Sequence, residues 1–232
     1  MAMSRRVLLL RIGALAAVAP WLRAARAQQD GTDYRSLEPP QPTGSPGKIE
    51  VIEFFSYACP HCAHFFPLVN AWDAKLPKDV TFRRVPVGFD RPQWVNLQRA
   101  FYALQASGDF ARLDGALFQA IHEQQQPLFD EQNLAAWVGR SGGHAEQFSA
   151  AYVSFGVNNQ TVQADKLASD YLIDSIPAMA VDGKYVALAD PAPGETAYLQ
   201  QLLANTDKLI VKVRAERAAT AKPATKPVTK SK

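Results

Sequence analysis

Cys59 and Cys62 are the only cysteines in this chain of 232 residues, and two residues separate them. Because a disulfide between them would close only a very small loop, it would add little stability, and the pair suits disulfide exchange or half of a zinc site better. Zinc would need two further ligands, and the histidines form no second closely spaced pair outside this motif. The histidines are His61, His64, His122 and His144. We expect a redox-active pair and no bound metal, with two inert core thiols as the alternative.

The residues around the pair predict a strand that passes into a helix. Residues 50–56 have the β-branched and aromatic content of a buried strand. Apolar residues then recur at helical spacing; they are Phe65, Leu68, Val69, Trp72 and Leu76, with Pro67 as an expected kink. Cys59 thus lies at the amino end of the helix, where unpaired N–H groups and the helix dipole favour a thiolate. We expect Cys59 to be the attacking sulfur and Cys62, one turn further in, to be buried and to resolve the mixed disulfide.

The remaining pattern predicts an α/β protein. In order, it indicates a strand at residues 80–87, a helical block at 91–172 whose last helix starts near 159, strands at 178–181 and 184–188, and helices at 198–203 and 208–217. An Asp-Gly turn joins the last two strands, which is a strong hairpin signal. This order is that of a thioredoxin fold interrupted by an inserted all-helical domain. Residues 28–90 and 173–218 are then the two parts of the thioredoxin fold, and 91–172 are the insertion.

The N-terminal residues 1–27 have the features of an export signal. An apolar stretch follows Ser-Arg-Arg at residues 4–6, and Ala-Arg-Ala at 25–27 supplies a small-x-small cleavage site. An uncleaved anchor is the alternative, but the apolar run is shorter than the ~20 residues that a span needs and contains Arg11 and Pro20. The paired arginines also fit a twin-arginine signal, so the export route stays open.

The formal net charge of +3 is unevenly distributed. Residues 1–27 hold five Arg and residues 219–232 hold four Lys, both without acids, which leaves −6 for residues 28–218. An acidic body argues against nucleic acid as a partner. Residues 219–232 repeat Lys, Pro, Ala and Thr and have nothing to bury, so we expect a disordered, solvated tail, with contact to an anionic membrane surface as the alternative.

The segment that ends at the second cysteine reads Glu53-Phe54-Phe55-Ser56-Tyr57-Ala58-Cys59-Pro60-His61-Cys62. It closely resembles the active-site segment of the DsbA family of periplasmic thiol:disulfide interchange proteins, which belong to the thioredoxin superfamily. The resemblance covers roughly residues 34–217, and thioredoxins and glutaredoxins carry other residues than Pro60 and His61 between the cysteines. It implies a monomeric periplasmic oxidase without a cofactor. Its partners would be reduced, unfolded exported proteins and a membrane reoxidase of the DsbB type linked to quinone.

The motif histidine, His61, is expected to stabilise the Cys59 thiolate through its imidazole or its backbone; a solvated loop histidine is the alternative. Each unit by which the pKa of Cys59 lies below ambient pH stabilises the reduced form by about 1.4 kcal/mol. For a two-electron couple this corresponds to about 30 mV of reduction potential. Several units would turn a reductant into a strong oxidant. We expect His64, His122 and His144 to be surface residues without such a role.

Glu53 stands out in an otherwise apolar strand. A carboxyl group there would be partly buried with a raised pKa, and it could relay a proton to or from Cys62. The resemblance likewise implies an acidic residue beneath the active site. The alternative is an acid at the strand edge that faces solvent or pairs with a lysine.

Pro177 opens the strand at residues 178–181. The resemblance implies that it forms the cis-proline loop that packs against the cysteines, with Ile176 presenting its backbone to an extended substrate peptide. An ordinary trans proline in a turn is the alternative.

Three functions are compatible with these residues. The first is the oxidase, in which the Cys59–Cys62 disulfide passes to substrates through a mixed disulfide at Cys59. The second keeps the fold but reverses the electron flow, as in a reductase or isomerase; isomerases usually carry a separate dimerisation region, and only a short segment precedes the first strand here. The third is a non-catalytic chaperone that binds peptides in the groove beside Pro177.

Overall fold

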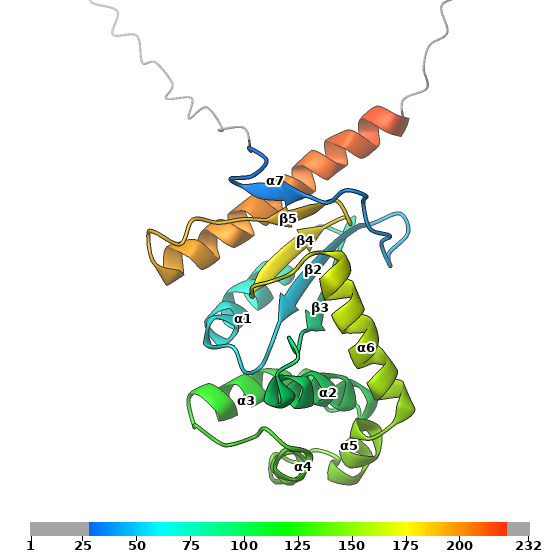
Figure 1. Ribbon diagram of the computed structural model, residues 1–232, viewed down its shortest axis with the longest axis vertical. Coiled ribbons are helices and arrows are strands. Elements are labelled where there is room, and N and C mark those ends of the chain that lie inside the picture. Colours follow the sequence, from blue (N-terminus) through cyan, green and yellow to red (C-terminus); the bar gives the residue numbers. More distant parts are fainter. Residues whose placement is uncertain (1–27, 222–232) are drawn as a thin grey trace, which may run out of the picture.

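The computed structural model describes residues 28–221 (Figure 1). The predicted export signal and residues 222–232 of the predicted tail lie outside the described residues. The elements are β1 (Tyr34–Ser36), β2 (Ile49–Phe55), α1 (Pro60–Asp73), β3 (Val80–Pro86), α2 (Pro92–Ala106), α3 (Phe110–His122), α4 (Glu131–Arg140), α5 (Ala145–Tyr152), α6 (Phe155–Asp170), β4 (Ala178–Val181), β5 (Tyr185–Ala187) and α7 (Glu195–Ala221).

One five-stranded sheet, in the order β1-β5-β4-β2-β3, organises the fold. Strands β2 and β3 are parallel, and the other neighbouring pairs are antiparallel. The parallel pair requires a crossover connection, which α1 provides. This arrangement is the thioredoxin fold with helices added between β3 and β4, so the predicted α/β fold class is confirmed. The sequence pattern did not predict β1, whose three residues pair with β5.

Strand β2 is buried along its whole length because helices cover both faces of the sheet. Its side chains alternate between the two faces. Ile49 and Val51 pack in a core cluster with residues of α1 and α7. Ile52 and Phe54 pack in a second cluster with residues of α6. The strand that leads into the cysteine motif is therefore fixed from both sides.

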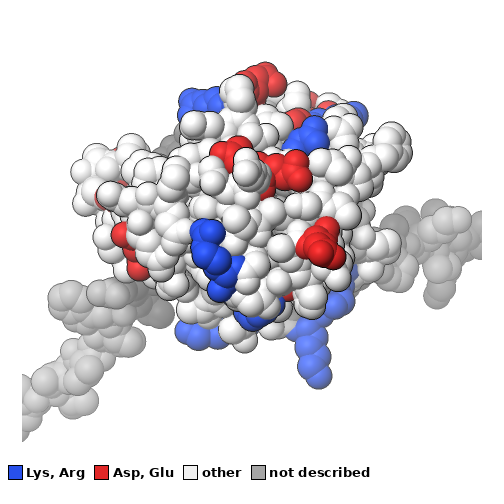
Figure 2. Space-filling view, turned by 90° about the horizontal axis from the view of Figure 1, so that it is seen from below, with Lys and Arg blue, Asp and Glu red and all other residues white. Residues whose placement is uncertain are grey.

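Helices α2 to α5 form a separate layer beyond one end of the sheet (Figure 1). Their core is built from large apolar side chains, among them Leu97, Leu104, Leu117 and Phe148, and the same cluster includes Cys59 and Cys62. The cysteine motif is thus packed against the helical layer. Seen from the helical end, basic and acidic side chains are interspersed among uncharged ones, and the described residues form no continuous basic patch on that face (Figure 2).

Two predictions about the helices need correction. The segments at 198–203 and 208–217 belong to one continuous helix, α7, because the residues between them include no Gly or Pro and pack well. Asn205 and Thr206 are both buried there, and their side chains donate hydrogen bonds to the Leu188 and Leu202 carbonyls. Helix α7 also runs three residues into the predicted tail, and α6 begins at Phe155 rather than near residue 159.

The hairpin between β4 and β5 turns through Asp182 and Gly183, as the sequence predicts. Both residues have positive φ, +57° and +67°, as the central residues of a type I′ turn require, and the Lys184 N–H donates a hydrogen bond to the Val181 carbonyl at 3.1 Å. A Cβ atom at Gly183 would lie 2.0 Å from the Gln41 carbonyl oxygen. Glycine is therefore required at this position for steric as well as conformational reasons.

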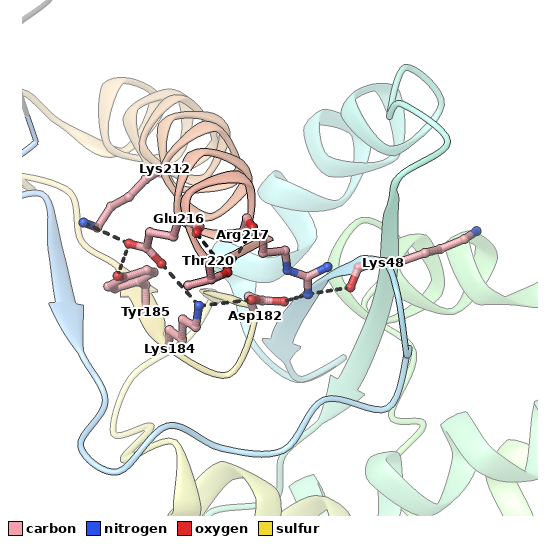
Figure 3. A network of polar contacts seen from close by, with 8 residues as sticks. All are labelled: Lys48, Asp182, Lys184, Tyr185, Lys212, Glu216, Arg217 and Thr220. Atoms are coloured by element: carbon pink, nitrogen blue, oxygen red, sulfur yellow. Dashed lines mark hydrogen bonds and ion pairs between the residues drawn. The ribbon is translucent and has the colours of Figure 1, made fainter. Parts of the chain in front are cut away.

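The C-terminal end of α7 holds this hairpin through a polar network (Figure 3). Arg217 donates hydrogen bonds to the Asp182 carboxylate and, at 2.9 Å, to the Lys48 carbonyl. Glu216 accepts a hydrogen bond from the Tyr185 hydroxyl at 2.6 Å and pairs with Lys184 at 3.2 Å. The last turns of α7 thus attach the turn of the hairpin and the start of β5 to the helix.

Candidate active site

The cysteine motif begins where β2 ends. Cys59 is the N-cap residue of α1, and Pro60 is the first helical residue, where the missing N–H of proline costs nothing. Cys62 is fully buried, as predicted, and the Cys59 side chain lies at the start of the helix with only 4% of the residue exposed. The Cys59 thiol donates a hydrogen bond to the Ile176 carbonyl with a sulfur–oxygen distance of 3.8 Å. Both cysteines are free thiols in the structure.

The pKa values of the two thiols are shifted in opposite directions. A hydrogen bond from the Cys62 thiol, with further support from the backbone N–H groups of Cys62 and His61 and the charge of His61, lowers the pKa of Cys59 to about 6. Burial raises the pKa of Cys62 well above its usual value. At neutral pH the pair therefore carries its thiolate on Cys59, which is the sulfur at the helix terminus.

His61 is exposed at the mouth of the site, and its Nδ1 atom lies 2.7 Å from the Glu195 carboxylate. This hydrogen bond raises the pKa of His61 above its ordinary value. His64, one turn along α1, binds the same carboxylate oxygen through its own Nδ1 at 2.8 Å. His64 is exposed as predicted, but it lies beside the motif histidine.

Glu53 lies beneath the cysteines in the middle of β2, in register with Arg84 of β3 and Met179 of β4. Its burial is complete rather than partial, since only 1% of the residue is exposed. The Oε2 atom has no hydrogen-bond partner, and the Arg84 Nε atom is 3.9 Å away. Desolvation raises the pKa of Glu53 to about 8. The carboxyl group is therefore largely protonated at neutral pH.

The Ile176–Pro177 peptide bond is cis, which confirms the prediction for this loop. The loop and the start of α7 border a cavity of about 620 Å³, whose lining includes His61, Ile176, Pro177, Leu188 and Tyr198. Because the lining is largely apolar and ends at the cysteine motif, an extended peptide could lie in the cavity and reach the Cys59 sulfur.

The family model described as "DSBA-like thioredoxin domain" matches residues 50–200. The chain belongs to this family. It is 39% identical to the "Thiol:disulfide interchange protein DsbA" of Burkholderia cepacia, over 84% of this chain and 93% of that protein. It is 37% identical to the protein of the same name from Bordetella pertussis, over 88% of this chain and 93% of that one. The crystal structure of Pseudomonas aeruginosa DsbA superimposes with a TM-score of 0.74 at 36% identity, covering 83% of this chain and 96% of that one.

This DSBA-like protein is accordingly a thiol:disulfide oxidoreductase that acts on protein disulfides. Within residues 28–221, no helix combines the length and the apolar character that a membrane span requires.

A buried polar cluster of the DSBA-like protein was not predicted from sequence. Arg84 donates a hydrogen bond to the Asp114 carboxylate of α3, and Asp114 accepts another from the Tyr57 hydroxyl at 2.5 Å. The Arg84 guanidinium also lies over the rings of Phe55 and Phe66, 4.6 Å and 4.9 Å from their centroids. The cluster therefore connects β3, the helical layer and the loop before Cys59.

The remaining two histidines, His122 and His144, differ in their exposure to solvent. His122 is half-buried at the end of α3, and its Nε2 atom donates a hydrogen bond of 2.7 Å to the Tyr57 carbonyl. The prediction of a surface residue is wrong for His122, because the helical layer packs against the loop before the motif. His144 is exposed as predicted and contacts the buried Asp109 at 3.0 Å.

Replacing Glu53 with glutamine should stabilise the DSBA-like protein at high pH. The pKa of Glu53 is raised from 4.5 to about 8, so between these values the folded state binds a proton that the unfolded chain has lost, and stability falls as pH rises. The Glu53→Gln variant has no ionisable group at this position, so its stability does not fall in this way as pH rises. We expect the variant to exceed the wild type in unfolding free energy by about 3–5 kcal/mol at pH 8 and above.

Urea unfolding at a series of pH values measures this difference. The gap should close as pH falls below 4.5, the ordinary value for the group. Glu146→Gln, which changes an exposed glutamate of α5, should show no such trend. A constant gap between pH 5 and pH 8 would show that Glu53 ionises normally in the folded protein.

Proposed function

We propose that this DSBA-like protein is a periplasmic dithiol-disulfide oxidase that gives the Cys59–Cys62 disulfide to newly exported proteins. The observation that carries the proposal is the asymmetry of the pair, with the pKa of Cys59 lowered to about 6 and that of Cys62 raised. A stabilised Cys59 thiolate favours the reduced enzyme, so the disulfide form tends to take two electrons from a substrate.

The reaction has two exchange steps. A substrate thiolate attacks the Cys59 sulfur, the enzyme disulfide breaks, and Cys62 leaves with the electron pair of that bond. A second substrate thiolate then attacks the substrate sulfur of the mixed disulfide, and Cys59 leaves as a thiolate. The substrate loses two electrons and gains a disulfide, and the enzyme becomes the dithiol. The lowered pKa of Cys59 makes it a good leaving group in the second step.

Glu53 is suited to supply the proton that Cys62 needs. The Cys62 thiolate formed in the first step is buried and has a high pKa, so it must be protonated at once. The pKa of Glu53, about 8, keeps its carboxyl group protonated at neutral pH, where it can act as a proton donor below the pair. Reoxidation would return the proton to Glu53.

The cavity beside Pro177 supports binding of an extended, unfolded segment. The Ile176 carbonyl is already within hydrogen-bond distance of the Cys59 sulfur, so a peptide paired with this backbone would place its own cysteine beside Cys59. The predicted partners are reduced, unfolded exported proteins and a DsbB-type membrane reoxidase linked to quinone. Residues 1–27 as an export signal and a monomeric state are part of the same proposal.

Equilibration of the purified protein with glutathione buffers of known ratio tests the direction of electron flow. A Cys59 pKa of about 6 lies one unit below neutral pH, which corresponds to about 1.4 kcal/mol or about 30 mV. We expect a potential above about −240 mV, that is, more than about 30 mV above the −270 mV or so of thioredoxin. A value at or below about −240 mV would reject the oxidase and favour a reductase or isomerase with the same fold.

A further inference from the structure

Two histidines and one carboxylate meet at the mouth of the active site. His61 and His64 lie on α1, and Glu195 is the first residue of α7. One carboxylate oxygen, Oε1 of Glu195, contacts Nδ1 of His61 at 2.7 Å and Nδ1 of His64 at 2.8 Å. The cluster thus joins side chains of two helices across 134 and 131 positions of the sequence.

The local structure explains why the three side chains converge. Residues three apart on a helix share a face, so both imidazoles point to the same side of α1. Gly194 has a φ of +98°, which ends the loop after β5 and lets α7 start at Glu195. Hydrogen bonds from His61 and His64 lower the pKa of Glu195, and the amino end of a helix further favours a carboxylate.

We propose that Glu195 is a positioning residue for the active-site histidine: it holds the His61 imidazole at the mouth of the site, and His64 competes with His61 for the same carboxylate oxygen. The effect on redox chemistry rests on the proposed function, in which His61 stabilises the Cys59 thiolate. We call the cluster of His61, His64 and Glu195 the clamp. The clamp itself depends only on the geometry of these three side chains.

The clamp acts on Cys59 through His61. The hydrogen bond to Glu195 raises the pKa of His61, and the positive charge of His61 in turn helps to lower the pKa of Cys59. Other titratable and charged groups surround His61 and Glu195. They are Cys59 at the N-cap of α1, Cys62 and His64 on α1, Tyr198 on α7, Glu53 below the two cysteines, and Asp174 and Arg35 along the cavity. Among the described residues, only Glu195 pairs a carboxylate with His61.

The shared oxygen gives two substitutions opposite effects. Glu195→Gln removes the charge that attracts a proton to His61, so His61 should lose its proton at lower pH. His64→Gln removes the imidazole that competes with His61 for Glu195, so His61 should keep its proton to higher pH. A residue that only stabilised the fold would not move this titration in two directions.

Titration of the His61 ring by NMR in the full-length dithiol protein tests the clamp. We expect Glu195→Gln to lower the pKa of His61 by about 0.5 unit and His64→Gln to raise it, since an exposed ion pair changes a pKa only modestly. Asp174→Asn is the control: it removes one negative charge from the same cavity but contacts neither histidine, so the pKa of His61 should stay near the wild-type value. A shift below about 0.2 unit in Glu195→Gln, or a fall in His64→Gln, would overturn the proposal.

A second readout separates the clamp from the proposed function. The thiolate absorbance of Cys59, followed against pH, should show a higher Cys59 pKa in Glu195→Gln than in Asp174→Asn. If the His61 titration shifts as expected and the wild-type potential still lies at the level of thioredoxin, the clamp stands and the oxidase assignment fails. If the potential is oxidising and His61 does not respond to Glu195→Gln, the oxidase stands and the clamp fails.

Discussion

Replacing Cys59 with serine should abolish disulfide exchange and give a protein that still folds. The sulfur that a substrate thiolate attacks is that of Cys59 at the amino end of α1, with its pKa lowered to about 6, and a serine hydroxyl at this position cannot form the mixed disulfide. Oxidation of a reduced, unfolded substrate by the variant should proceed at the rate of the uncatalysed reaction. The measurement is the loss of substrate thiols with time.

The matched variant is Cys62→Ser, which keeps the attacking sulfur and removes the resolving one. In this variant the Cys59 thiolate can attack a disulfide of glutathione or of an oxidised substrate, and the second sulfur of that disulfide leaves as a thiolate. Because no Cys62 thiol can then displace the bound sulfur, the mixed disulfide at Cys59 should accumulate, and mass spectrometry of the unreduced protein detects it. If Cys59→Ser retained full function in cells that depend on the protein, the chaperone alternative would replace the enzyme.

The largest loss of stability is expected for Arg84→Met. The Arg84 side chain is 7% exposed, pairs with the Asp114 carboxylate and is the cation nearest to Glu53. Removing one partner of a buried pair leaves the other uncompensated, which costs about 3–5 kcal/mol. Methionine fills much of the same volume between the rings of Phe55 and Phe66, so the loss reports the charge more than the packing.

Chemical denaturation measures this loss, and Arg214→Met is the matched control. Arg214 of α7 pairs with Asp79 at 2.8 Å, but both side chains are nearly half exposed, so the same substitution should cost less than about 1 kcal/mol. A combination of Arg84→Met with Asp114→Asn should recover part of the loss, because it removes the carboxylate that Arg84→Met leaves without a partner. Equal costs for Arg84→Met and Arg214→Met would refute the role of the buried cluster.

The sequence predicts the local parts of this site well. A strand that passes into a helix fixes the position of Cys59, and the apolar surroundings of Glu53 indicate its raised pKa. The hairpin turn at Asp182 and Gly183 follows from a two-residue pattern, and the cis bond at Pro177 follows from resemblance. All of these except the cis bond depend on neighbours within a few residues, which a pattern can reveal.

The contacts between distant segments could not be predicted in the same way. Glu195 carries no local signal for a contact with His61, since an acid at the start of a helix is common. Asp114 is a single acid in an amphipathic helix, and only the packing of α3 against α1 and α2 brings it to Arg84. His122 reads as an ordinary polar residue at a helix end, although it binds the loop before the motif.

Helix α7 is long enough to contact two separate parts of the molecule, the active-site mouth and the hairpin between β4 and β5. The helix starts at the active-site mouth with Glu195 and spans 27 residues, and at 1.5 Å per residue it is about 40 Å long. The C-terminal end of α7 binds the turn between β4 and β5 (Figure 3). Strand β4 begins directly after Pro177. The strand that follows the cis-proline loop is therefore held from the side opposite to α2–α5. These contacts of α7 involve no residue of α2–α5, so the inserted helices can change without loosening them.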